Sequence, residues 1–189
     1  VPTNANTNSV LGASAGSFTI AKAATVTTLD CGVGTFPYTG AALTPCSATV
    51  TGAGGLSQSV SVTYVGNVDV GTAAVNAKYA GSANYLASSA VDTFVIDKAA
   101  TTTVVTCAPG PFTVTGSAIE PCTAVVTGPG GLSQSLAVVY SNNVAVGTAT
   151  ATANYGGGAS YLPSSDTEVF IIGAAVDKSV FLNLPFLSK

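Results

Sequence analysis

The stretch Gly-Leu-Ser-Gln-Ser at residues 55–59 recurs letter for letter at residues 131–135, an offset of 76 residues. With this offset, residues 22–97 align without a gap to residues 98–173, and 41 of the 76 positions are identical. The matching positions are mainly turn glycines, cysteines and apolar residues that favour strands. Tandem copies at a fixed period indicate an array in which each copy is a structural unit.

The residues around this stretch predict β-structure. Val, Thr, Tyr, Phe and Ile alternate with polar residues, and no long segment has helical periodicity. A glycine-rich turn at 52–55 separates two such segments, which is typical of a β-hairpin. In the first repeat we expect strands at 22–31, 46–51, 56–65, 71–79 and 93–96, with a loop at 32–45. The pattern predicts an all-β protein of two tandem immunoglobulin-like β-sandwich domains, each with an internal disulfide.

The repeat boundaries predict four parts. These are an N-terminal extension at 1–21 with a closing-type strand, repeats at 22–97 and 98–174, and an apolar tail at 175–189. Residues 94–99, Phe-Val-Ile-Asp-Lys-Ala, join the repeats without a Gly, Pro or Ser linker. Such a short connection restricts bending, so we expect a stiff rod.

The four cysteines form two pairs with the same spacing. Cys31 and Cys46 lie in the first repeat, and Cys107 and Cys122 occupy the same positions in the second. Pairing within each repeat treats both copies alike, and the absence of a C-x-x-C motif argues against a zinc or redox site. The alternative is four buried free thiols. Disulfides are typical of oxidising compartments, so we expect an extracellular, cell-surface protein.

This chain has few charged residues, and their scarcity argues against several classes of function. Only 7% of residues are charged, the net charge is −3, and there is no His or Arg. Without His the commonest general base is absent, which argues against an enzyme, and we expect no cofactor or metal. Five basic residues make nucleic-acid binding improbable, and no apolar run is long enough to span a membrane. A surface of Thr, Ser and Ala repels neighbouring copies weakly.

Several motifs together resemble a known family. They are the closing strand at 94–99, the Tyr38-Thr39-Gly40 loop, the hairpin at 50–56, and the segments at 70–73 and 79–81. On these motifs the chain resembles bacterial immunoglobulin-like repeats of the MBG type. The resemblance covers residues 18–173 and implies a stalk module of a large secreted surface or adhesin-like protein, with no catalytic residues. The second repeat has Val114 in place of Tyr38, so the resemblance gives Tyr38 only a packing role.

The chain ends suggest a mode of assembly. Phe18 and Ile20 repeat the closing-strand motif without a domain in front of them, and the tail is apolar at Val180, Phe181, Leu182, Leu184 and Phe186. Exposed strand edges and apolar tails favour association. We therefore hypothesise head-to-tail joining by strand addition, with copies of itself or flanking repeats as partners. The alternative is that both ends are cut edges of a longer array.

Other candidate residues have simpler interpretations. The glycine turns at 52–55 and 128–131 lack the helix and Gly-Lys-Ser/Thr sequence of a phosphate loop. Asn67 and Asp69 offer too few oxygens for calcium. The tyrosines could line a glycan-binding face, but packing fits them better. We expect a core that contains Tyr64, Leu86, Phe94 and Ile96, with their second-repeat partners Tyr140, Leu162, Phe170 and Ile172.

The sequence therefore predicts a non-enzymatic extracellular structural protein. It would form part of a cell-surface stalk or a self-assembling filament. The alternative is an adhesin module that binds glycan or another surface.

Overall fold

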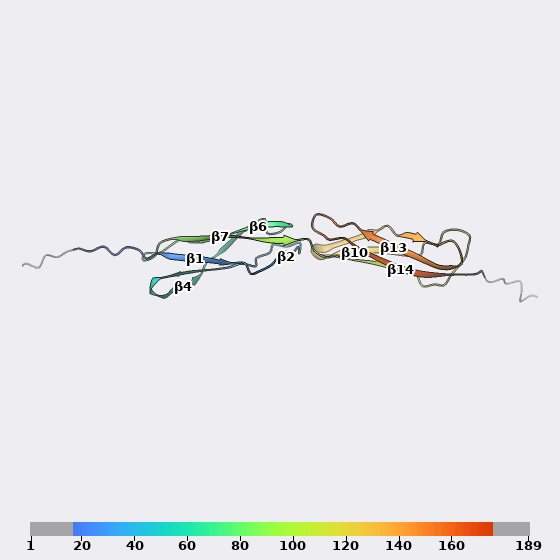
Figure 1. Ribbon diagram of the computed structural model, residues 1–189, viewed down its shortest axis with the longest axis horizontal. Helices are drawn as coiled ribbons and strands as arrows, with labels where there is room; N and C mark the ends of the chain where they lie inside the picture. Colours follow the sequence, from blue (N-terminus) through green and yellow to red (C-terminus); the bar gives the residue numbers. More distant parts are fainter. Residues whose placement is uncertain (1–16, 176–189) are drawn as a thin grey trace, which may run out of the picture.

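The computed structural model describes residues 17–175. Two β-sandwiches follow one another end to end and give the molecule an elongated shape (Figure 1). The described residues contain strands and two short 3-10 turns but no α-helix. The predicted all-β fold of two immunoglobulin-like sandwiches is confirmed.

The first repeat is a sandwich of a three-stranded and a four-stranded sheet. Its sheets have the orders β1-β3-β4 and β2-β7-β6-β5. All pairs are antiparallel except β2 with β7, which is parallel. The strands are β1 (Thr25–Asp30), β2 (Phe36–Pro37), β3 (Ser47–Gly52), β4 (Leu56–Ser59), β5 (Val62–Val65), β6 (Gly71–Tyr79) and β7 (Ser88–Asp97).

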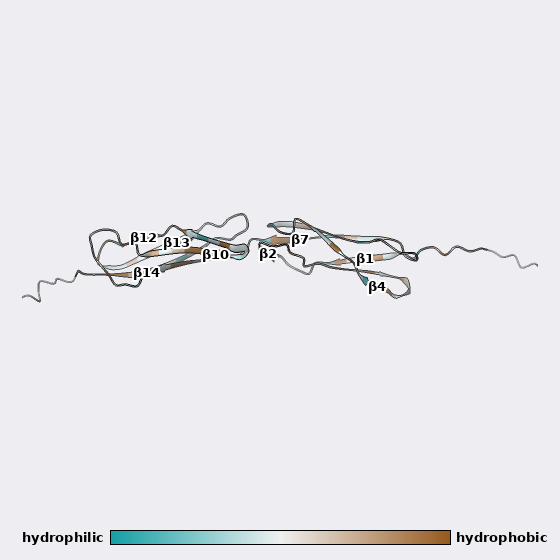
Figure 2. Ribbon diagram, turned by 180° about the vertical axis from the view of Figure 1, so that it is seen from behind, coloured by the Kyte–Doolittle hydropathy of each residue, from teal (hydrophilic) through white to brown (hydrophobic). Residues whose placement is uncertain are grey.

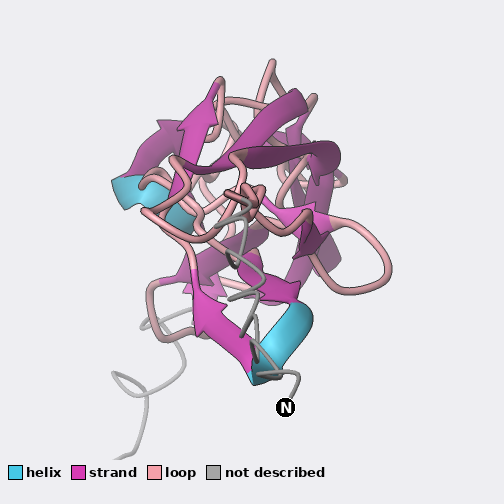
Figure 3. Cartoon of the chain, turned by 90° about the vertical axis from the view of Figure 1, so that its left-hand side faces the viewer, coloured by secondary structure: helices cyan, strands magenta, loops and turns pink. Residues whose placement is uncertain are grey.

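The second repeat has the same topology. Its sheets have the orders β11-β10-β8 and β12-β13-β14-β9. The two 3-10 turns lie at different positions around the long axis in Figure 3, so the second repeat is rotated about that axis relative to the first. The strands are β8 (Thr102–Cys107), β9 (Phe112–Thr113), β10 (Cys122–Gly128), β11 (Leu132–Leu136), β12 (Val139–Ser141), β13 (Gly147–Tyr155) and β14 (Ser164–Gly173).

One expected strand is in fact two. We expected residues 56–65 to form a single strand, but β4 ends at Ser59 and β5 begins at Val62 in the opposite sheet. The Val60 amide still donates a hydrogen bond to Ala48 O of the first sheet (3.0 Å). After this residue the chain crosses to the other sheet. The crossing lets one continuous stretch of strand-forming residues contribute to both layers of the sandwich.

The core lies between the sheets and is built from alternating residues. Ala73 and Val75 of β6 point inward beside Phe94 and Ile96 of β7, and all four are buried. Figure 2 shows brown, hydrophobic segments along the strands of both repeats. Tyr64 is half-buried and meets Phe94 edge to face, with ring centroids 6.3 Å apart. The second-repeat partners Phe170, Ile172 and Tyr140 are placed in the same way.

The prediction that Leu86 and Leu162 belong to the core is wrong. Leu86 is 50% exposed and Leu162 is 45% exposed. Their backbones are fixed at the edge of the sandwich, where the Leu86 amide donates to Ala23 O (2.9 Å). With its backbone held in this way, the Leu86 side chain points outward. The apolar character of leucine alone does not predict this orientation.

Both predicted disulfides are formed. Cys31 is joined to Cys46, and Cys107 to Cys122. Cys107 and Cys122 face each other on the adjacent strands β8 and β10, so the bond links neighbours within one sheet. The Tyr140 hydroxyl donates to Cys122 O and accepts from Cys122 N, both at 2.9 Å, and Tyr64 does the same at Cys46. Each disulfide therefore closes the loop that precedes the next strand and holds it beside the core.

Candidate functional site

The two repeats contact each other at the junction between them. Strand β7 ends at Asp97, and two residues later Ala99 forms a parallel bridge with Tyr161 of the second repeat. The Ala99 amide donates to Ser160 O (2.9 Å), and Ala99 O accepts from the Leu162 amide (2.8 Å). The connecting segment is thus hydrogen-bonded into the second sandwich at once and leaves almost no free linker.

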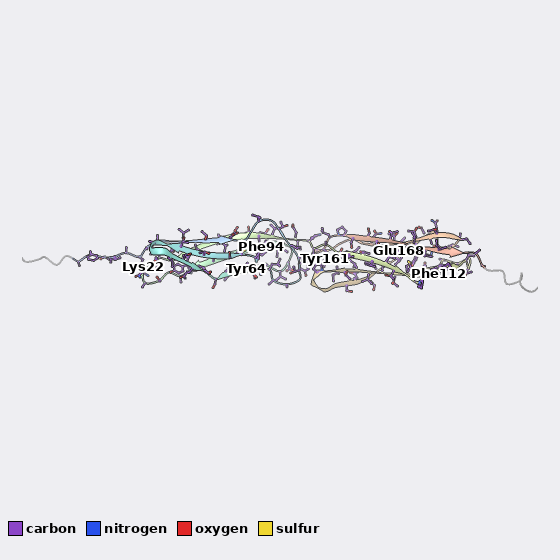
Figure 4. The ribbon with its side chains drawn as sticks, turned by 90° about the horizontal axis from the view of Figure 1, so that it is seen from below. Lys22, Tyr64, Phe94, Phe112, Tyr161 and Glu168 are labelled. Carbon is purple, nitrogen blue, oxygen red and sulfur yellow. A yellow bond between two sulfur atoms is a disulfide. The ribbon has the colours of Figure 1, made fainter. Side chains whose placement is uncertain are left out.

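Tyr38 reaches across this junction from the first repeat. Strand β2 runs parallel to β7, and the Tyr38 amide extends this pairing by donating to Asp97 O (2.9 Å). The Tyr38 ring meets the Tyr161 ring edge to face, with centroids 5.5 Å apart and an interplanar angle of 88°. Figure 4 shows Tyr161 between the two sandwiches. Such aromatic pairs contribute about 0.5–1.5 kcal/mol beyond the area that they bury.

Two glycines let the backbones meet beside the tyrosines. Gly40 and Gly130 both have positive φ (79° and 69°), a conformation that glycine adopts without a steric penalty. A Cβ on Gly130 would lie 3.1 Å from Gly40 Cα and 3.2 Å from Tyr38 Cε1. Any larger residue at either position would push the two repeats apart.

Tyr161 is held in place from its own repeat. Its hydroxyl donates to Pro129 O (2.7 Å) at the tip of the β10–β11 hairpin. Desolvation by the surrounding groups raises the pKa of Tyr161, and the neighbouring Tyr38 raises it further. The hydrogen bond to Pro129 O fixes the hydroxyl end of the ring beside the place where Tyr38 contacts it.

Direct contacts hold the two repeats against each other at the junction. The aromatic pair of Tyr38 with Tyr161 and the contact of Gly40 with Gly130 join the repeats beside their covalent connection. Domains joined by a free linker move independently, whereas direct packing beside a short linker restricts bending. The arrangement aligns the two sandwiches.

The residues predicted for assembly are partly described. Phe18 and Ile20 are 84% and 83% exposed and belong to no strand. Their repeat partners Phe94 and Ile96 are buried in the first sandwich. The same motif is therefore core in one place and solvent-exposed in another. The other residues predicted for assembly lie outside the described residues: Val180, Phe181, Leu182, Leu184 and Phe186.

The structure gives the alternative candidates internal roles. The side-chain amide of Asn67 donates to Leu43 O (2.8 Å), so Asn67 anchors the loop that contains Leu43. Between residues 17 and 175 no group of three or more His, Cys, Asp or Glu side chains could hold a metal ion. The hydroxyls of Tyr64 and Tyr85 bond backbone atoms of their own repeat, which supports packing over a glycan face. No helix in this range is long and apolar enough to cross a membrane.

Sequence reasoning missed the junction residues. The sequence pattern indicated packing for Tyr38 and Tyr161, a hairpin turn for Gly130 and a loop for Gly40, but it did not indicate that these residues meet between the repeats. A signal was present, since the first repeat has Tyr38 where the second has Val114, and in this chain only the first is followed by another repeat.

Comparison with known proteins gives no family. No protein-family model matches this chain, and no curated protein sequence matches it.

Proposed function

We propose that this chain is a non-enzymatic extracellular structural protein, a rod of immunoglobulin-like repeats within a cell-surface stalk or a self-assembling filament. The observation that carries this proposal is the packed junction, where Tyr38 meets Tyr161 beside the contact between Gly40 and Gly130. A stalk must hold its length, and this junction opposes bending at the point where a two-domain chain is weakest. The resemblance to MBG-type repeats of surface proteins points the same way.

The extracellular location is supported by the two disulfides, since such bonds persist in oxidising compartments. The low charge also suits lateral packing in a stalk or fibre, because uncharged Thr, Ser and Ala faces repel one another weakly.

The finer proposal is that copies join head to tail by strand addition. The exposed Phe18 and Ile20 support it, because this motif is buried wherever it completes a sandwich. An added strand would bury both side chains and satisfy backbone groups of the recipient sheet. The contact joins different surfaces of two copies and does not close, so it would propagate a filament.

The second candidate function is an adhesin module that binds glycan. One observation favours it: a shallow hollow of about 360 Å³ on the outer face of the β5-β6-β7 sheet, where Thr63, Asn76 and Asp92 lie beside Val65 and Val91. Polar groups beside apolar surface suit a sugar ring. A glycan array with the purified protein distinguishes the candidates, since a structural rod gives no saccharide-specific signal.

Electron microscopy of the purified chain tests the rod directly. We expect particles as long as two aligned sandwiches, alone or joined in filaments. Deleting residues 1–20 or 176–189 tests strand addition by solution mass and filament length, and we expect shorter or no filaments. If both truncated proteins assemble like the full chain, or the full chain stays monomeric at high concentration, strand addition is excluded and the stalk remains.

A further inference from the structure

The surface that receives Tyr38 on the second repeat is present a second time. On the first repeat, the Tyr85 hydroxyl donates to Ala53 O (2.7 Å), as that of Tyr161 does to Pro129 O. Ala23 bridges Tyr85 as Ala99 bridges Tyr161, and Gly54 has the φ of Gly130 (71° against 69°). We call this surface, residues 53, 54 and 85 or 129, 130 and 161, the near end of each repeat.

The near end of the first repeat is hollowed in the described chain. A cavity of about 380 Å³ is bounded by Ala53, Gly54, Ala83 and Tyr85, together with residues 20–23 of the entering segment. A Cβ on Gly54 would approach only the hydroxyl of Tyr85 (3.4 Å), whereas one on Gly130 also meets Gly40 and Tyr38. The hollow thus lies where the second repeat receives an aromatic ring and a glycine turn.

The opposite end of the molecule carries the complementary loop. We call residues 38–40 and 114–116 the far end of each repeat. The Val114 amide donates to Gly173 O (2.9 Å), as Tyr38 does to Asp97 O, and Thr115 bonds Ser117 as Thr39 bonds Ala41. Gly116 has the φ of Gly40 (81° against 79°), and a Cβ there would meet no described residue within 4 Å.

We propose that the near end of the first repeat is a docking site for the far end of the second repeat in another copy of this chain. The occupant follows from the internal junction, where the same near end is filled by the same kind of loop. Figure 4 places Lys22 and Phe112 at opposite ends of the rod, so the two surfaces face away from each other along its axis. This inference rests on the proposed role as a rod and names the contact that would extend it.

Two differences set the strength of this contact. Val114 is smaller than Tyr38, so it fills the hollow incompletely and forms no aromatic pair with Tyr85. In addition, Asp97 and Lys98 connect the two repeats covalently in the internal junction. Between copies, two separate segments compete for that place: the end of β14 in one copy and residues 17–22 of the other. Residues 17–22 pair with no strand and can yield that place. The contact between copies is therefore weaker than the internal one.

The substitution Val114→Tyr tests the inference in the full chain. It gives the second repeat the residue that the first repeat has at the equivalent position. Tyr38 packs against the core of the first repeat there, as Val114 does in the second. Sedimentation velocity over a concentration series should show self-association strengthened by about tenfold, the order expected for one added aromatic pair and its burial. Melting temperature and circular dichroism establish that the variant folds.

Adding Ala83→Glu to this variant should reverse the gain, because Ala83 is exposed and lines the hollow. Gln58→Glu is the matched control, since it adds the same charge at an exposed position on the side of the rod and should leave the gain intact. Unchanged association with Val114→Tyr overturns the docking site, as does a gain that Ala83→Glu leaves in place. Either result is compatible with the proposed role as a rod. X-ray scattering that shows a chain bent at its internal junction would contradict that role.

Discussion

Gly40 of the first repeat lies against Gly130 of the second, so close that a side chain on Gly40 would overlap the Gly130 backbone. The two residues come from different loops of different sandwiches. Their contact places the Tyr38 and Tyr161 rings at the distance of an edge-to-face pair. The junction is thus set by backbone shape as well as by the short connection between the repeats.

Gly40→Ala should loosen the junction more than Gly116→Ala does. Both glycines have nearly the same positive φ (79° and 81°), so both substitutions carry a similar backbone penalty, of order 1 kcal/mol. Only Gly40 has another backbone against it. Small-angle X-ray scattering should show a broader distribution of end-to-end lengths for Gly40→Ala alone. Equal distributions for both variants would mean that this contact does not align the repeats.

Tyr161 should ionise above the usual tyrosine range. Desolvation and the neighbouring Tyr38 raise its pKa in the folded chain, so folding favours the neutral ring. The associated stability is present below the unfolded pKa of about 10 and is lost as the pH rises through the higher folded value. In a tyrosinate absorbance titration, the component that Tyr161→Phe removes should therefore lie above the usual tyrosine pKa of about 10. A loss spread over the whole titration would contradict the raised pKa.

Removing one disulfide should destabilise only the repeat that contains it. Cys31→Ala with Cys46→Ala opens a loop of 15 residues, a change of about 3 kcal/mol in the chain-entropy model. Calorimetry should show one of two transitions move to lower temperature. The matched pair Cys107→Ala with Cys122→Ala should move the other. Mass spectrometry of a non-reduced digest checks the pairing, and a Cys46–Cys107 link would refute it.

Phe94→Ala and Leu86→Ala should separate core from surface. Phe94 is buried against Phe36 and Tyr64, so its truncation should cost about 3–5 kcal/mol. Leu86 is half exposed, and its truncation should cost about 1 kcal/mol or less. Chemical denaturation of the two variants gives both values. Similar losses would show that the assignment of Leu86 to the surface is incorrect.

The repeat, the all-β class and the cysteine pairing could be read from the sequence because they are local or periodic. Alternation along residues 71–79 marks a half-buried strand. Each repeat holds two cysteines with the same separation of 15 residues, which indicated the pairing within each repeat. The glycine turns at 52–55 and 128–131 each join two antiparallel strands of a hairpin. Each of these features depends on neighbours in the chain.

Only the tertiary structure decided three features: the exposure of the Leu86 side chain, the crossing of the chain between β4 and β5, and the contacts at the junction. Leu86 is as apolar as a core residue, but the anchoring of its backbone at Ala23 points it outward. Tyr38 and Tyr161 are far apart in sequence, and their pairing depends on how two finished sandwiches meet. Sequence patterns record which residues favour burial, whereas the partner of a surface residue depends on the relative placement of whole domains.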